Sequence, residues 1–483
     1  MKRQKFESLS ALLILFLFIS ACGQNDVTFP SDELVFTETP QMTAATSTEE
    51  IVIADPTQRS ATATSTEETI ARFTIQADVD LEQAVKALYE IFYDGETPVF
   101  VQTGGDLLVT HPENEDDIHP SLEATFLPGA VLVSLSNIPE VTEFIAYAIS
   151  IEGQQSLIDA GALPKTVTLT DQAGKILKIE QPVRRVISSH GPTTAIVYSV
   201  GAGDRLVAAS YLGARDPLGA SVMEKMDRRF SGIMGDDLFS QDSFNIEEAV
   251  VREPDLILTS ARSTWIDTVA ELDIPVVLFE AETPERLKEA VLLLGQLFGP
   301  NSTAQAQAWV HYYETTLESI QTAVSQIPLE ERSRVLFTGT EPFRVISGDM
   351  YQNDLIQAAG GRSVSIELSG YWNNVNLEQI VLWQPDVILV PPYGGASVEA
   401  ITASPEWQIL EAVQEGRVYR MPKLVAPWDT PAPDSVLGMI WLAERLYPQV
   451  TPMTCVQEAE YFYNTFYQYD ITAEEIDTIC PIK

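Results

Sequence analysis

A phrase that occurs twice in the chain constrains the fold most strongly. Residues 245–258 read NIEEAVVREPDLIL, and residues 376–389 read NLEQIVLWQPDVIL. In each copy Asn can cap a helix, Glu suits its first turn, Pro ends the helix, and the aliphatic run is typical of a strand buried on both faces. Each copy is therefore one helix-to-strand step of an α/β sheet, and two copies predict two similar lobes.

The surrounding sequence extends this pattern. A strand is expected at 274–279, after a helix around 265–272. From about residue 283 helical spacing prevails, interrupted at Gly299-Pro300, and a helix of this length could bridge two lobes. The expected organisation is a lobe at 166–282, an interlobe helix at 283–327, and a C-terminal lobe with its closing helices at 328–483.

The first 22 residues indicate the compartment. They read MKRQKFESLSALLILFLFISAC. A basic start is followed by an apolar run and by small residues before Cys22, and this order is typical of an export signal. The run is shorter than the about 20 residues of a permanent span, and Ile19-Ser20-Ala21-Cys22 resembles the bacterial lipobox. We therefore expect a signal at 1–22 and lipidation of Cys22; the alternative is an ordinary signal with an incidental cysteine.

The next segment has the composition of a tether. In residues 23–70 Thr, Ser, Pro, Glu and Ala dominate, Arg59 is the only basic residue, and TSTEE occurs twice. Such a stretch has too little apolar surface to offset the entropy of ordering it. We expect a disordered tether, with a glycosylated stalk as the alternative.

Charge and motif content exclude several function classes. The chain has 29 Lys and Arg against 69 Asp and Glu, a net charge of −40, which is the wrong sign for a nucleic acid partner. It contains no HExxH, CxxC or GxSxG pattern, and its four histidines are not clustered. Gly201-Ala202-Gly203 lacks the third glycine of a dinucleotide site and suits a helix C-cap. We expect no catalysis, cofactor or metal site; a hydrolase built from distant residues is the alternative.

Several phrases in order carry a family resemblance. Residues from about 166 to 447 are similar to the iron-siderophore and cobalamin type (class III, cluster A) of ABC-transporter substrate-binding protein. The phrases are VTLTDQAGKILKIEQPVRRVISSHGPTTAIVYSVGAGDRLVAAS from Val167, the two N-x-E…PD phrases, NDLIQAAGG from Asn353, GRVYRMP from Gly416 and WDTPAPDSVLGMIWLAERLYP from Trp428.

This resemblance implies an α/β fold of two Rossmann-like lobes joined by one long rigid helix, with ligand held between the lobes and a small closure. The implied protein is a lipid-anchored, extracytoplasmic monomer on the periplasmic or cell-surface side, which delivers an iron chelate, haem or cobalamin to an ABC permease and its ATPase. Molybdate or tungstate is the second ligand class. A surface or signalling adaptor on the same fold is a further alternative.

Residues 71–164 precede this region. Their end, VTEFIAYAISIEGQQSLIDAGALP from Val141, resembles the closing helices of extracellular substrate-binding proteins for molybdate and similar oxyanions. That class needs two full lobes, so these residues predict a partial α/β lobe without a complete binding site. A generic helical appendage is the alternative.

Candidate ligand-binding residues follow expected strands. His190 stands between the strand at 186–187 and a probable helix start at Gly191, and open α/β sheets bind ligands at such strand ends. Arginines at these positions suit carboxylate or oxyanion groups and rings suit a chelate, although each ring alone fits a core equally well. The other candidates chosen by this logic are Tyr211, Arg262, Trp265, Arg344, Tyr351, Trp372, Tyr393 and Trp428.

Two further pairs of residues have expected roles. In the family that the chain resembles, glutamates at the positions of Glu247 and Glu378 face arginines of the permease; the alternative is first-turn helix stabilisation. With Cys22 lipidated, Cys455 and Cys480 remain, and in an oxidising compartment we expect them to pair. Catalytic thiols are the alternative.

Overall fold

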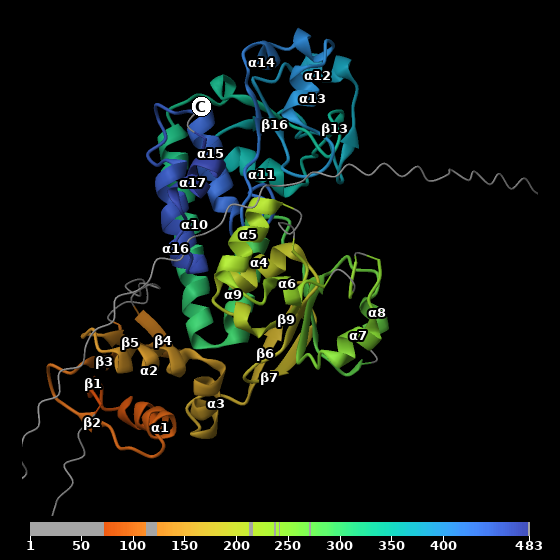
Figure 1. Cartoon of the computed structure of the whole chain (residues 1–483). Coiled ribbons are helices and arrows are strands. Elements are labelled where there is room, and N and C mark those ends of the chain that lie inside the picture. Colours follow the sequence, from red (N-terminus) through yellow and green to blue (C-terminus); the bar gives the residue numbers. More distant parts are fainter. Residues whose placement is uncertain are drawn as a thin grey trace, which may run out of the picture. The chain divides into compact units, whose positions relative to one another are not determined.

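The computed structural model describes residues 72–112, 123–211, 216–235, 238–240, 242–269 and 272–481 (Figure 1). The expected signal at 1–22, the lipidation of Cys22 and the tether at 23–70 lie outside these residues.

The first described part is a domain with a five-stranded mixed sheet. Its strand order is β2-β1-β3-β5-β4, with β1, β2 and β3 parallel and β4 and β5 antiparallel. Ile75, Leu88 and Phe144 are buried in a hydrophobic core of its own. The elements are β1 (Thr74–Ala77), α1 (Glu82–Phe92), β2 (Val99–Phe100), β3 (Leu107–Thr110), β4 (Glu123–Leu127), β5 (Ala130–Ser134), α2 (Pro139–Ile149) and α3 (Ile151–Asp159). We call residues 72–164 the N-terminal domain.

The second part is an α/β lobe that follows an antiparallel hairpin of β6 (Thr166–Thr170) and β7 (Ile176–Glu180). Its four strands are all parallel, in the order β9-β8-β10-β11. The elements of this N-lobe are β8 (Val186–Ser188), α4 (Gly191–Ser199), β9 (Leu206–Ala209), α5 (Pro217–Met226), α6 (Phe230–Ile233), α7 (Ile246–Val251), β10 (Leu256–Ser260), α8 (Ile266–Val269) and β11 (Val276–Phe279).

The third part, the C-lobe, repeats the same topology. Its parallel sheet has the order β14-β12-β16-β17, so in both lobes the first strand lies between the second and the third. A short antiparallel pair, β13 with β15, is added at one side. The elements are β12 (Arg334–Phe337), β13 (Arg344–Val345), α11 (Tyr351–Ala358), β14 (Arg362–Ser363), β15 (Asn373–Asn374), α12 (Leu377–Trp383), β16 (Val387–Val390), α13 (Val398–Thr402), α14 (Glu411–Gln414), β17 (Val418–Arg420) and α15 (Ser435–Leu446).

The duplicated phrase forms the same local structure in both lobes. Asn245 caps α7 by accepting a hydrogen bond from the backbone N–H of Glu248 at 3.2 Å. Asn376 caps α12 by accepting one from Gln379 at 2.9 Å. Each helix then leads through Pro-Asp into the third strand of its sheet, β10 or β16. The two-lobed α/β fold expected from the sequence is confirmed.

The segment at 283–327, expected to be an interlobe helix with an interruption at Gly299-Pro300, consists of two helices. They are α9 (Pro284–Phe298) and α10 (Pro300–Val324), and they pack against each other. Gly299 separates them with a φ of +105°, a conformation that favours glycine, and Pro300 starts the new helix. Only α10 extends to the C-lobe, where it packs on α11 and α15 (Figure 1).

The last helices also connect the lobes. They are α16 (Cys455–Tyr467) and α17 (Ala473–Ile479), and α16 packs against α15 of the C-lobe and α4 of the N-lobe. Lys225 at the end of α5 lies 2.6 Å from the carboxylate of Glu475 in α17. Because these contacts hold the lobes together in addition to α10, we expect ligand binding to change their separation little.

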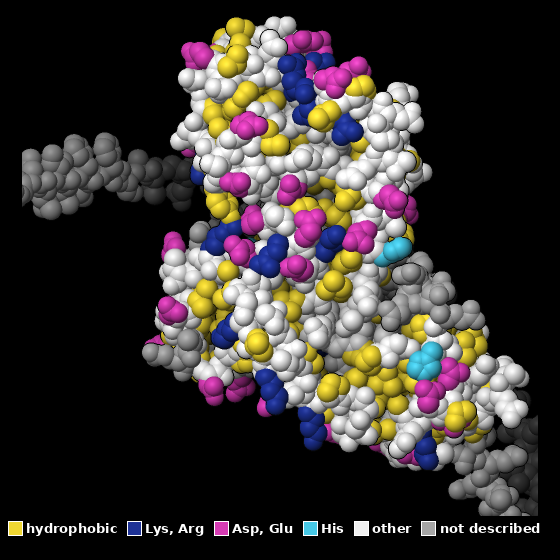
Figure 2. Space-filling model, turned by 180° about the vertical axis from the view of Figure 1, so that it is seen from behind, with side chains coloured by type: hydrophobic (Ala, Val, Ile, Leu, Met, Phe, Trp, Pro, Cys, Tyr) yellow, Lys and Arg dark blue, Asp and Glu magenta, His cyan; other side chains and the backbone are white. Residues whose placement is uncertain are grey.

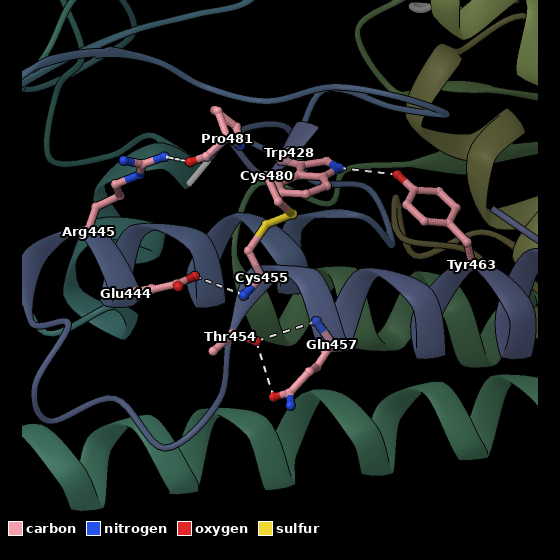
Figure 3. The surroundings of a disulfide bond; sticks show 9 residues. All are labelled: Trp428, Glu444, Arg445, Thr454, Cys455, Gln457, Tyr463, Cys480 and Pro481. Atoms are coloured by element: carbon pink, nitrogen blue, oxygen red, sulfur yellow. Dashed lines mark hydrogen bonds between the residues drawn. A yellow bond between two sulfur atoms is a disulfide. The ribbon is translucent and has the colours of Figure 1, made fainter. Parts of the chain in front are cut away.

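A disulfide joins the two last helices. Cys455 at the start of α16 is bonded to Cys480 just after α17, with Cα atoms 5.7 Å apart (Figure 3). Both residues are buried. The bond therefore closes the C-terminal end of the chain onto the helix that contacts both lobes.

Replacing both cysteines with serine is expected to lower the free energy of unfolding by about 3 kcal/mol, because the crosslink restricts the unfolded chain. Denaturant titration followed by circular dichroism measures the change. Wild-type protein titrated in reductant should unfold like the double variant. Equal stability of the oxidised wild type and the variant would contradict the prediction.

Candidate functional site

The topology of the two sheets defines where a ligand can bind. In each lobe the first and third strands are neighbours in the sheet. The connection after the first strand runs to one edge of the sheet, and the connection after the third strand runs to the other edge. Open α/β sheets bind ligands at the carboxyl ends of two such neighbouring strands. In the N-lobe these strands are β8 and β10, followed directly by the loops with His190 and Arg262. In the C-lobe they are β12 and β16; Tyr393 follows β16, and Arg344 begins β13, the next strand after β12. His190, Arg262 and Tyr393 thus stand at carboxyl ends of the two parallel sheets.

His190 lies between β8 and α4, at the N-cap position of the helix. Its Nδ1 is 2.8 Å from the hydroxyl of Thr193, which fixes the ring orientation. Burial, and next the positive charge of Arg262, lower the pKa of His190 to about 4. The imidazole is therefore neutral at pH 7, and it presents a dipole rather than a charge to a ligand.

Arg262 connects the two lobes. Its guanidinium forms an ion pair with Glu282 of the N-lobe at 2.9 Å. It also lies over the ring of Tyr371 of the C-lobe, 4.5 Å from the ring centroid. Burial raises the pKa of Glu282. The arginine is 42% exposed despite these contacts, so part of the guanidinium remains accessible to an anionic ligand.

Tyr393 in the C-lobe is held by a buried carboxylate. Its hydroxyl donates a hydrogen bond of 2.6 Å to Oδ2 of Asp429. Asp429 is fully buried, and its Oδ1 has no hydrogen-bond partner among the described residues. Burial raises the pKa of Asp429 to about 6 and that of Tyr393 well above its usual value. The pair positions the phenol ring after β16.

Arg344 and Trp372 form a second cation–π pair. The guanidinium carbon lies 5.7 Å from the ring centroid of Trp372. The ring is also close to Gly339, where an added Cβ would come within 2.8 Å of it. Both side chains are partly buried. The C-lobe therefore has a guanidinium braced by an aromatic ring, as Arg262 is braced by Tyr371.

Two predicted ligand-binding residues of the C-terminal half lie in the core, which corrects their assignment. Trp428 is fully buried, and its indole N–H donates to the hydroxyl of Tyr463 in α16 at 3.3 Å (Figure 3). Tyr351 is 1% exposed and its hydroxyl is 2.6 Å from that of Ser435 in α15. Both residues stand at the positions that the sequence predicted, but their side chains pack beneath the C-terminal helices.

Two predicted residues of the N-lobe are also buried. Trp265 is 4% exposed and stacks on Phe244, with ring centroids 4.4 Å apart. Tyr211 is 7% exposed and meets the ring of Phe230 edge-on at 5.4 Å. Trp265 belongs to a hydrophobic cluster on one side of the sheet and Tyr211 to the main core. Neither presents an accessible ring.

Sequence reasoning missed three residues that the structure adds to the site. Glu282 follows β11 by three positions, so the strand-end rule that selected Arg262 could have found it. Asp429 stands directly after Trp428 in a quoted phrase, where the tryptophan was chosen instead. Tyr371 lies in a loop between β14 and β15, and no sequence signal distinguishes it from Trp372 beside it.

Comparison with known proteins gives the family. Residues 186–424 match the model of the periplasmic binding protein family. This part of the chain belongs to that family. The match begins within the N-lobe, at β8, so the N-terminal domain lies outside it.

Individual relatives agree with this assignment. The periplasmic binding protein region is similar to the molybdate-binding protein MolA of Haemophilus influenzae, at 23% identity over 58% of this chain and 85% of the relative. It is 28% identical to the vitamin B12-binding protein of Yersinia pestis over 44% of this chain and 70% of that protein. A periplasmic solute binding protein from Veillonella parvula has the same fold, with a TM-score of 0.58, 24% identity, and coverage of 66% of this chain and 97% of that one.

Glu247 and Glu378 have equivalent places in the two lobes. Each is the second residue of its helix, α7 or α12, directly after the Asn cap and one aliphatic residue. Both side chains are exposed. The carboxylates of these two glutamates, one in each lobe, are therefore available at the surface.

Figure 2 shows acidic and basic side chains interspersed over the face that it presents, without one dominant charged patch.

Within the ranges that the structure describes, no helix is both long and apolar enough to cross a membrane. Those ranges also contain no group of three or more His, Cys, Asp or Glu side chains placed to hold a metal ion.

Proposed function

We propose that this protein is the substrate-binding component of an ABC importer and binds a bulky or anionic metal complex between its two lobes. The ligand classes that we favour are an iron-siderophore chelate, haem and cobalamin. The observation that carries the proposal is Arg262, which extends from one lobe to the ring of Tyr371 in the other and remains partly exposed. A guanidinium suits a carboxylate or phosphate group, and rings suit the flat apolar surface of a chelate or macrocycle.

Molybdate or tungstate is the second candidate, favoured by the similarity to the Haemophilus influenzae molybdate-binding protein. The two ligand classes need different side chains for binding. A small oxyanion needs the arginines and hydrogen-bond donors, whereas a chelate also needs the rings of Tyr371, Trp372 and Tyr393. Substituting these rings with leucine would weaken binding of a chelate and spare an oxyanion.

Native mass spectrometry and metal analysis of protein purified from its own cells test the proposal. A bound metal complex, or a bound oxyanion, at one per chain is the expected result. Folded protein that carries neither, and that takes up neither when both are supplied, would favour the adaptor function over transport.

The proposal includes a lipid anchor on Cys22, an extracytoplasmic location, a monomeric state, and docking of Glu247 and Glu378 to a permease. A diacylglyceryl group with an amide-linked acyl chain would provide the two hydrophobic signals that stable anchoring needs.

Replacing Cys22 with serine is expected to move the protein from the membrane fraction to the soluble fraction, because no acyl chains can then be attached. Cell fractionation followed by immunoblotting measures the shift. The Cys455→Ser/Cys480→Ser variant serves as the control, since it replaces the two disulfide-bonded cysteines without touching the anchor. Unchanged membrane association of Cys22→Ser would show that another feature holds the protein there.

A further inference from the structure

A cavity of about 280 Å³ lies between the N-terminal domain, the β6–β7 hairpin and the turn from α9 to α10. None of the interlobe residues described above lines it. Its walls include Thr125, Gln154 and Ile158 of the N-terminal domain, and Thr303 and Ala304 of α10. Three separate segments of the chain thus meet around one space.

Hydrogen bonds hold these segments in place. Gln154 donates from Nε2 to the backbone oxygen of Phe298 at 3.1 Å, and Gln181 donates from Nε2 to that of Leu297 at 3.1 Å. Both acceptors are carbonyls of the last turn of α9, which lack partners within the helix. Asn301 at the start of α10 accepts a hydrogen bond from the backbone N–H of Thr125 at 3.2 Å. The cavity therefore has walls fixed by specific contacts.

Gly299 permits this arrangement. An added Cβ at this position would come within 2.9 Å of Nε2 of Gln154. The φ of +105° also disfavours any other residue there. The glycine thus serves both the reversal of the chain and the close approach of the N-terminal domain.

The chemistry of the cavity differs from that of the interlobe site. Its lining residues are aliphatic side chains, Pro, Gly, Thr and Gln, with no Asp, Glu, Lys, Arg or His among them. Moving a charged ligand into such a space without a counter-charge is unfavourable. The space therefore selects uncharged molecules, in a protein whose interlobe site has two arginines.

We propose that this cavity is a second binding site, for an uncharged and largely apolar molecule of one or two rings. The size follows from volume, since an apolar cavity of about 150 Å³ holds one benzene molecule. The ligand contacts the N-terminal domain and α10 at once, and so it stabilises the attachment of this domain to the helix that reaches the C-lobe. The site does not depend on which ligand binds between the lobes.

The test titrates the full-length protein with benzyl alcohol, toluene and benzoate, observed by ligand NMR. Benzyl alcohol should bind saturably and at least tenfold more tightly than benzoate. Ala304→Phe, which fills the cavity from α10, should weaken benzyl alcohol binding at least tenfold. Ala323→Phe is the matched control on the same helix, outside the cavity lining, and should leave binding unchanged.

A comparison within the wild-type protein tests the proposal even if Ala304→Phe fails to fold. Toluene, which carries no charge, should also bind more tightly than benzoate. Benzyl alcohol binding that is equal in wild type and Ala304→Phe, or benzoate binding as tight as that of benzyl alcohol or toluene, would overturn the proposal.

Discussion

Charge reversal at both Glu247 and Glu378 is expected to abolish uptake of the ligand by cells while leaving its affinity for the purified protein within about twofold of wild type. Both carboxylates are exposed at the second position of their helices, one in each lobe. Lysines at these positions would repel the arginines expected on the permease, and like charges brought together at an interface weaken binding strongly. Uptake assays with cells and calorimetry with the purified variant give the two measurements.

A matched control separates docking from helix stabilisation. Glu285 and Glu399 are likewise exposed second residues of their helices, α9 and α13. Reversing their charge replaces the same favourable interaction with the helix N-terminus by an unfavourable one. The Glu285→Lys/Glu399→Lys variant should therefore lose similar stability and retain uptake. Equal uptake in both double variants would show that Glu247 and Glu378 do not dock.

Replacing Arg262 with alanine is expected to weaken ligand binding about 10- to 150-fold, the range that corresponds to the loss of a charged hydrogen bond of about 1.5 to 3 kcal/mol. The side chain belongs to the N-lobe but contacts Tyr371 of the C-lobe, so the variant also loses a contact between the lobes. Arg262→Lys keeps the charge without the planar fork and should bind with intermediate affinity. Calorimetry of the three proteins with the same ligand gives these affinities.

Arg286 provides the control for this prediction. It forms an ion pair with Glu289 at 3.1 Å and is about as exposed as Arg262, but it lies on α9. Arg286→Ala should therefore leave affinity unchanged while removing the same charge from the protein. If Arg262→Ala and Arg286→Ala bind the ligand equally well, Arg262 is not part of the site.

The two-lobed fold was predictable because its signals are local. Both copies of the duplicated phrase fold as expected because each of their signals depends only on residues that are neighbours in sequence. These signals are the Asn cap, the first-turn Glu, the Pro-Asp step and the aliphatic strand. The length of the interlobe helix was less predictable, because helical spacing continues on both sides of Gly299. Whether a glycine there interrupts one helix or reverses the chain depends on what packs against it, in this case Gln154 of a distant domain.

Side-chain direction accounts for the other errors. The strand-end rule locates a backbone position at the edge of a sheet, but the rotamer decides whether the side chain enters the space between the lobes or the core. Arg262 follows its strand to an exposed position and Tyr393 follows its strand to a partly buried one. Trp428 and Trp265 follow theirs into hydrophobic clusters, where large rings bury the most surface.

Titration calorimetry of the purified protein with a ferric siderophore, haem, cobalamin and molybdate tests the central claim most directly. The account predicts binding of one ligand per chain, with micromolar or tighter affinity for at least one of the metal complexes, and loss of that affinity in Arg262→Ala. A folded protein that binds none of the four, or that binds one of them equally well without Arg262, would contradict it.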